Sequence, residues 1–202
     1  MKNTIILLLV LITFSCKAQT NLTFSLQNYD YGKKLISGSY VKDTYNDFNK
    51  FEGTWKYEDA NREFIIKLRK RTHVLHDFKS VYIDLLGGEY QYLLNGTEMV
   101  NTTANLFNDS SIYANNINGY TFIRNSSFPS CTDCSSTERR VLLNISDPER
   151  PWVNAYIVLR YLNTNGIEKI IGTIYYTTTL VPDDETPADL RVPSGEFTFI
   201  KQ

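Results

Sequence analysis

The stretch TWKYEDANREFIIKLRKR, residues 54–71, decides the fold class of this chain. Residues 54–58 predict a short strand, residues 59–61 a turn, and residues 62–71 a longer strand. Within the longer strand, apolar residues alternate with residues that are mostly charged. The alternating apolar positions are Phe64, Ile66 and Leu68. A period of two predicts an antiparallel strand that turns one face toward a core and the other toward water.

The same pattern continues toward the C-terminus and is broken by turn signals at short intervals. Four dipeptides predict two-residue hairpin turns, because their residues readily adopt the positive φ angles that fit the twist of paired strands. These dipeptides are Gly87-Gly88, Asn95-Gly96, Asn118-Gly119 and Asn165-Gly166. The strands expected around them are residues 80–86, 89–94, 97–100, 111–117, 120–124, 152–162, 167–178 and 195–200.

Short strands joined mostly as neighbours predict an all-β fold, an antiparallel up-and-down (lipocalin-like) meander barrel of about eight to ten strands. Before the barrel, residues 40–51 predict a short N-terminal helix. The reason is that Tyr45, Phe48 and Phe51 would share one face of such a helix.

The N-terminus carries the pattern of a secretory signal, with Lys2, an apolar run over residues 5–14 and a small residue at Ser15. The apolar run is shorter than the roughly 20 residues needed to cross a bilayer. Cys16 follows directly, as at a bacterial lipoprotein site, so we expect its thiol to be lipidated and to anchor the protein to a membrane. The expected location is the outer membrane or the periplasm. Alternatively, cleavage after Ala18 would leave a secreted or soluble periplasmic protein.

The chain length of 202 residues suits one domain of ordinary size once the export segment is subtracted. We therefore expect a lipoprotein signal peptide over residues 1–15 and a tether with the short helix over residues 16–50. The β-barrel domain is expected over residues 51–202.

Apart from Cys16, the chain has two cysteines, Cys131 and Cys134, in a polar stretch typical of a loop. In an oxidising compartment, this spacing predicts a local disulfide. Three alternatives stay open: a redox-active pair, a pair of free thiols, and a zinc site completed by His73 and His76. We favour the disulfide and expect no metal. Residues three apart on a strand point to opposite faces, so the two histidines would converge only on a turn.

Lysine and arginine number 21 against 22 aspartates and glutamates, so the chain lacks the positive charge of a dedicated nucleic-acid-binding domain. The chain has two histidines, and it carries no serine-hydrolase, metalloprotease or nucleotide-binding motif. We therefore expect no catalytic residue, no cofactor and no enzymatic activity. The basic run at residues 67–71 is interpreted as a solvated strand face.

Two motifs resemble those of known families. The tripeptide Gly53-Thr54-Trp55 resembles the Gly-x-Trp motif that opens lipocalin-like (calycin) barrels. This resemblance implies that the tryptophan packs across one barrel end, and it places Lys201 where lipocalins have an arginine against that tryptophan. The motif FEGTWK at residues 51–56, together with the SCKAQ exit of the signal, resembles an uncharacterised (domain of unknown function) family. Its members are small exported lipoproteins of the Bacteroides–Flavobacterium group, and the resemblance implies no established activity.

These observations together predict binding and not catalysis. A small barrel can hold an apolar or amphipathic ligand at its mouth, and tyrosines offer apolar rings with polar hydroxyl groups. The tyrosines expected to line such a cavity are Tyr90, Tyr92, Tyr156, Tyr161, Tyr175 and Tyr176. The alternative is a structural or interaction lipoprotein of the cell envelope, whose barrel is filled by its own aromatic residues and holds no ligand. The sequence leaves the oligomeric state open.

Overall fold

The computed structural model describes residues 22–29, 35–177, 183 and 186–202. Its strands are β1 (Thr23–Ser25), β2 (Tyr40–Lys42), β3 (Gly53–Glu58), β4 (Arg62–His76), β5 (Val81–Leu94), β6 (Thr97–Asn101), β7 (Ile117–Ile123), β8 (Arg140–Ile145), β9 (Ala155–Thr164), β10 (Ile167–Tyr176) and β11 (Gly195–Lys201). The helices of the described residues are single 3-10 turns: η1 (Leu26–Asn28), η2 (Asn49–Phe51), η3 (Asp77–Lys79) and η4 (Thr103–Asn105). None of these helices has the length and apolar composition that crossing a bilayer requires.

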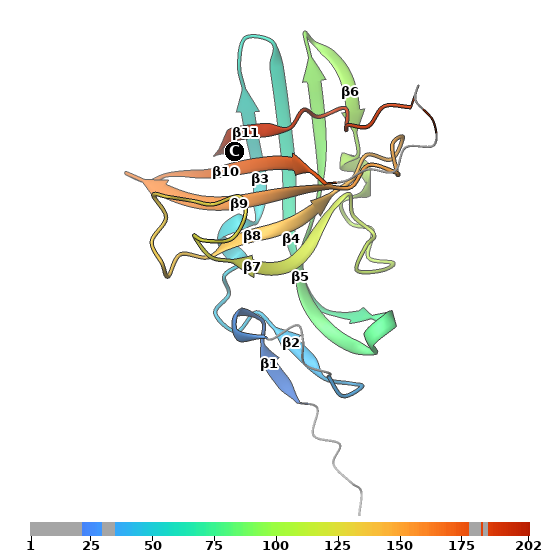
Figure 1. Ribbon diagram of the computed structural model, residues 1–202, viewed down its shortest axis with the longest axis vertical. Helices are drawn as coiled ribbons and strands as arrows, with labels where there is room; N and C mark the ends of the chain where they lie inside the picture. Colours follow the sequence, from blue (N-terminus) through green and yellow to red (C-terminus); the bar gives the residue numbers. More distant parts are fainter. Residues whose placement is uncertain (1–21, 30–34, 178–182, 184–185) are drawn as a thin grey trace, which may run out of the picture.

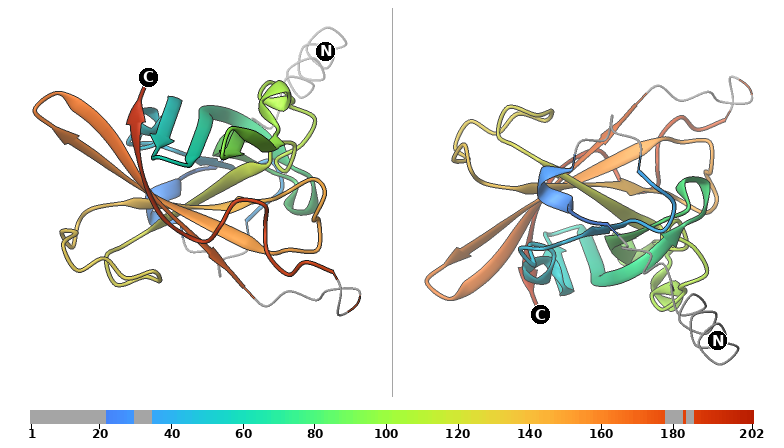
Figure 2. Two further views of the ribbon diagram at one scale, coloured as in Figure 1. Left: turned by 90° about the horizontal axis from the view of Figure 1, so that it is seen from above. Right: turned by 90° about the horizontal axis from the view of Figure 1, so that it is seen from below.

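Eight strands close into an antiparallel barrel in the order β3-β4-β5-β7-β8-β9-β10-β11, with β11 returning to β3. At this closing seam, Lys201 lies opposite Trp55. In Figure 1, β3 to β5 stand upright and β8 to β11 cross them, and the β9–β10 hairpin projects from the barrel in both Figure 1 and Figure 2. Apart from the closing β11–β3 pair and the short β6, which lies outside the closed barrel, neighbours in the barrel are also neighbours in sequence. The predicted all-β up-and-down barrel is therefore confirmed.

The long strand β5 joins the barrel to its extensions. One edge of β5 pairs with β4 over most of its length. The other edge pairs in succession with three strands: Tyr82 and Ile83 with β2, Leu86–Gly88 with β7, and Gln91–Leu94 with β6. This arrangement satisfies the backbone groups of a 14-residue strand that would otherwise present a long open edge.

Two of the four predicted turns lie inside strands. Gly87 and Gly88 are in the middle of β5, where a Cβ on Gly88 would come within 2.5 Å of the carbonyl oxygen of Lys67. Asn118 and Gly119 belong to β7, at a register shift toward β8. At these glycines, neighbouring strands of the sheet approach each other closely, and the chain does not change direction. The prediction of turns there was therefore wrong.

The other two predicted hairpins are present. Asn95 and Gly96 connect β5 to β6 with φ angles of 52° and 76°, and Asn165 and Gly166 connect β9 to β10 with φ angles of 53° and 82°. Both pairs adopt the left-handed conformation that two-residue hairpins require. One barrel strand, β8, has no counterpart among the predicted strands.

Residues 40–51 do not form the predicted helix. They contain the strand β2, which pairs in parallel with β5, and the single 3-10 turn η2. Between them, the carboxylate of Asp43 accepts hydrogen bonds from the backbone N–H groups of Asp47 and Phe48, each at 3.0 Å. A side chain that takes these donors holds the backbone in a turn, so it competes with a continuous helix. The aromatic spacing that suggested a helix instead places Phe48 and Phe51 in the core.

Inside the barrel, aromatic rings from β4, β5 and β11 cluster around Phe64. Its ring centroid lies 6.0 Å from that of Tyr90, 5.8 Å from Tyr92, 5.3 Å from Phe197 and 5.1 Å from Phe199. All five side chains are buried, at 2% exposure or less. Ring pairs at these separations and steep angles gain energy beyond the apolar area that they bury.

We expect Phe64→Ala to lower the free energy of unfolding by about 3–5 kcal/mol, because it removes the ring that the four others contact. The matched control is Phe78→Ala, since Phe78 is 89% exposed. We expect that change to stay within about 0.5 kcal/mol of the unsubstituted protein. Urea denaturation of the three proteins measures both values. Equal losses in the two variants would contradict the packing described here.

Candidate functional site

Trp55 lies at the seam of the barrel, where β11 returns to β3, and contacts the segment before the barrel. Its indole is fully buried, and Nε1 donates a hydrogen bond to the carbonyl oxygen of Phe51 at 2.8 Å. The ammonium of Lys201 lies 5.3 Å from the indole centroid, and the ring of Tyr161 stands edge-on at 6.4 Å. A cation over the indole face contributes a cation–π attraction. Gly53, two residues before the indole, has a φ of 123°, a conformation that favours glycine.

Two of the tyrosines predicted to line a cavity, Tyr90 and Tyr92, face the interior but belong to the packed centre. The Tyr90 hydroxyl donates to the carbonyl oxygen of Ser146 at 2.9 Å, and burial raises the pKa of Tyr90 above its ordinary value. Tyr92 packs edge-on against Phe64. Both rings are nearly inaccessible to solvent, so neither borders open space that a ligand would occupy.

Tyr161 and Tyr176 lie nearer the ends of their strands and are partly exposed. The hydroxyl of Tyr161 donates to Oε1 of Glu168 at 2.7 Å, and that of Tyr176 donates to the carbonyl oxygen of Val192 at 2.7 Å. Glu168 in turn pairs with Lys201 at 2.8 Å. Both hydroxyl groups that were expected to contact a ligand therefore donate their hydrogen bonds within the protein.

Tyr156 and Tyr175 lie on the outer face of the barrel, so the prediction that they line an interior cavity was wrong. Side chains point alternately to the two faces of a strand, so the core residues of β9 mark its inward face. Leu159 and Ile157 belong to the core, and Tyr156 is one residue out of phase with them. Outside, the rings of Tyr156 and Tyr175 stack at 5.6 Å, and Phe128 packs edge-on against Tyr175 at 4.9 Å.

Two adjoining hollows lie on this outer face, over β7, β8 and β9. Their volumes are about 160 Å³ and about 290 Å³. Both are lined by Tyr113, Asn118, Asn144 and Tyr156. Only Tyr156 among these residues was a predicted site residue. The other three could not be identified from the sequence, because the register of three strands and the path of the preceding loop bring them together.

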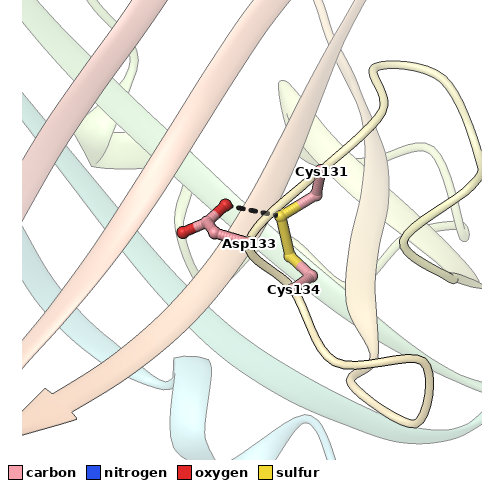
Figure 3. A group of neighbouring side chains, drawn as sticks. All are labelled: Cys131, Asp133 and Cys134. Carbon is pink, nitrogen blue, oxygen red and sulfur yellow. Dashed lines mark hydrogen bonds between the residues drawn. A yellow bond between two sulfur atoms is a disulfide. The ribbon is translucent and has the colours of Figure 1, made fainter.

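A disulfide joins Cys131 and Cys134 in the loop between β7 and β8 (Figure 3). The loop is held against β9, because Oδ2 of Asp133 accepts a hydrogen bond from Arg160 at 2.6 Å. The pairing with Arg160 lowers the pKa of Asp133. Donor atoms of the two cysteines and Asp133 lie within 4.8 Å of one another, but in the disulfide form the sulfur atoms are not the thiolates that bind zinc.

The two histidines lie on β4, away from this loop. The His73 ring stacks on Tyr82 at a centroid distance of 4.0 Å. The His76 ring is buried near Tyr113 and Tyr120, and burial lowers its pKa, with the charge of Lys79 acting in the same direction. Burial therefore favours the neutral imidazole of His76.

The basic run at residues 67–71 is not a solvated face, contrary to the sequence interpretation. Arg71 is buried at 4% exposure, and both Arg69 and Arg71 pair with Asp109. Lys70 pairs with Asp43 at 3.0 Å. These ion pairs hold the segment before the barrel and the loop after β6 against β4.

Comparison with known proteins identifies the family. The family described as "Family of unknown function (DUF6705)" matches residues 1–202, the whole length of the chain. The chain belongs to this family. No curated protein and no solved structure gives a significant match. The family description carries no activity, so functional inference depends on the geometry of the chain itself.

Proposed function

We propose that this member of DUF6705 is an exported, lipid-anchored envelope protein that acts through its outer surface and holds no ligand inside its barrel. The observation that carries the proposal is the cluster of buried rings around Phe64, which occupies interior space between β4, β5 and β11. Eight-stranded barrels are just wide enough either to be filled by side chains or to hold one small ligand. The packed interior favours the filled form, which is the second of the two functions expected from the sequence.

The contacts of the histidines favour binding over catalysis. Among the described residues, neither imidazole is hydrogen-bonded to a serine, threonine or cysteine side chain, the partner that a histidine base activates in hydroxyl or thiol nucleophilic catalysis. His73 is stacked on a tyrosine and His76 is enclosed by aromatic rings.

The anchor part of the proposal comes from the sequence. Cys16 and the preceding signal lie outside the described residues. Acyl chains on Cys16 would supply membrane affinity through their buried methylene groups. The bacterial outer membrane or periplasm, within the Bacteroides–Flavobacterium group, is the setting that this signal supports.

We expect the mature protein from a bacterial host to carry acyl chains on Cys16 and to stay with the membrane in a salt wash, because its affinity comes from buried methylenes and not from charge. Mass spectrometry of the N-terminal peptide measures the modification. The control Cys16→Ser should leave a soluble protein. An unmodified peptide that starts at Gln19 would contradict the anchor and support cleavage after Ala18.

We expect a fluorescent fatty-acid probe to show no saturable binding to the detergent-free Cys16→Ser protein, because the rings around Phe64 leave no room for an alkyl chain. Titration of probe fluorescence measures this. Saturable binding that is competed by unlabelled fatty acid would overturn the proposal of a filled barrel and restore an interior ligand site.

A further inference from the structure

A row of side chains in register crosses the outer-face hollows over β7, β8 and β9, here called the outer groove, and continues beyond them onto β10. Asn118 of β7 lies opposite Asn144 of β8, Asn144 lies opposite Tyr156 of β9, and Tyr156 lies opposite Tyr175 of β10. Neighbouring strands are about 4.8 Å apart, so the row extends for roughly 14 Å across the sheet. Two amides are thus followed by two stacked phenol rings on one outer face.

Several polar atoms of the groove are available to a ligand. Asn118 is 8% exposed, and its Nδ2 donates to the carbonyl oxygen of Asn115 at 2.7 Å. Its Oδ1 has no hydrogen-bond partner among the described residues, and the same holds for the hydroxyls of Tyr113 and Tyr156. These atoms are therefore free to bond to water or to a ligand.

The groove also lacks charge. None of the described residues that line either hollow is charged, although charged residues make up 21% of the chain. The hollow beneath the disulfide loop, in contrast, is lined by Asp133, Arg140, Arg160 and Glu196. An uncharged lining offers nothing to neutralise a phosphate, sulfate or carboxylate, while its amides and hydroxyls would lose their water against a purely apolar lipid.

We propose that the outer groove binds a short neutral oligosaccharide. Sugar rings present C–H faces that pack on phenol rings such as those of Tyr113 and Tyr156, and hydroxyl groups that both donate and accept hydrogen bonds. The amides of Asn118 and Asn144 combine a donor and an acceptor, which matches such hydroxyls. The inference rests on the proposed function, because it names the ligand class for action through the outer surface.

The test uses the full-length mature protein in detergent and a panel of immobilised oligosaccharides, with neutral gluco-, manno-, galacto- and xylo-oligosaccharides beside acidic ones. The best neutral member is then titrated calorimetrically against three variants. Tyr113→Ala and Asn144→Ala change exposed positions of the groove, and Tyr45→Ala is the matched control. Tyr113 and Tyr45 are 55% and 57% exposed, so loss of either ring leaves the core intact.

We expect binding to at least one neutral oligosaccharide, with a loss of at least tenfold in affinity in each groove variant and no change in Tyr45→Ala. Thermal unfolding confirms that the variants are folded. Binding to no neutral member, binding to acidic members alone, or equal affinity in Tyr113→Ala and the wild type would overturn the inference. Those results would leave the filled barrel standing, whereas saturable fatty-acid binding would overturn the proposed function itself.

Discussion

The packing of Phe64 against four aromatic rings is the constraint on which the rest of this structure depends. A closed sheet of eight strands leaves an interior that must be occupied by side chains or by a ligand. Here β4, β5 and β11 each contribute large rings to one point, so the interior is occupied by the protein itself. The eight-stranded closure and the choice of aromatic residues at the inward positions are therefore two aspects of one packing solution.

The segment before the barrel adds to this packing and is held to the barrel by an ion pair. Phe48 and Phe51 are fully buried, and Phe51 accepts the indole hydrogen bond of Trp55. The carboxylate of Asp43 pairs with Lys70 and accepts two backbone hydrogen bonds. Burial alone would raise the pKa of Asp43, but these bonds lower it below its ordinary value. The carboxylate is therefore ionised in its pair, and the N-terminal segment is fixed to the barrel. With the interior filled and this segment in place, the surfaces left for recognition are the loops and the outer faces of the strands.

The features that follow from local chemistry could be predicted from the sequence. The alternation of residues in β4 predicts its inward face correctly. The hairpins at Asn95-Gly96 and Asn165-Gly166 and the disulfide between Cys131 and Cys134 were also predicted correctly. Features that depend on distant partners could not be predicted. Gly87 and Gly88 are residues typical of a turn, but they lie inside a strand and allow close approach of neighbouring atoms. Tyr156 is a residue suited to lining a cavity, but it lies one residue out of phase with the core. The outer groove needs the register of three strands, which no local pattern contains.

Diffraction from crystals pressurised with xenon tests the central claim, a filled interior, most directly, because xenon enters dry apolar cavities without requiring a chemical match. We expect no xenon site among Phe64, Tyr90 and Phe197. A xenon atom bound between these rings would show that the barrel is hollow and would contradict a filled interior.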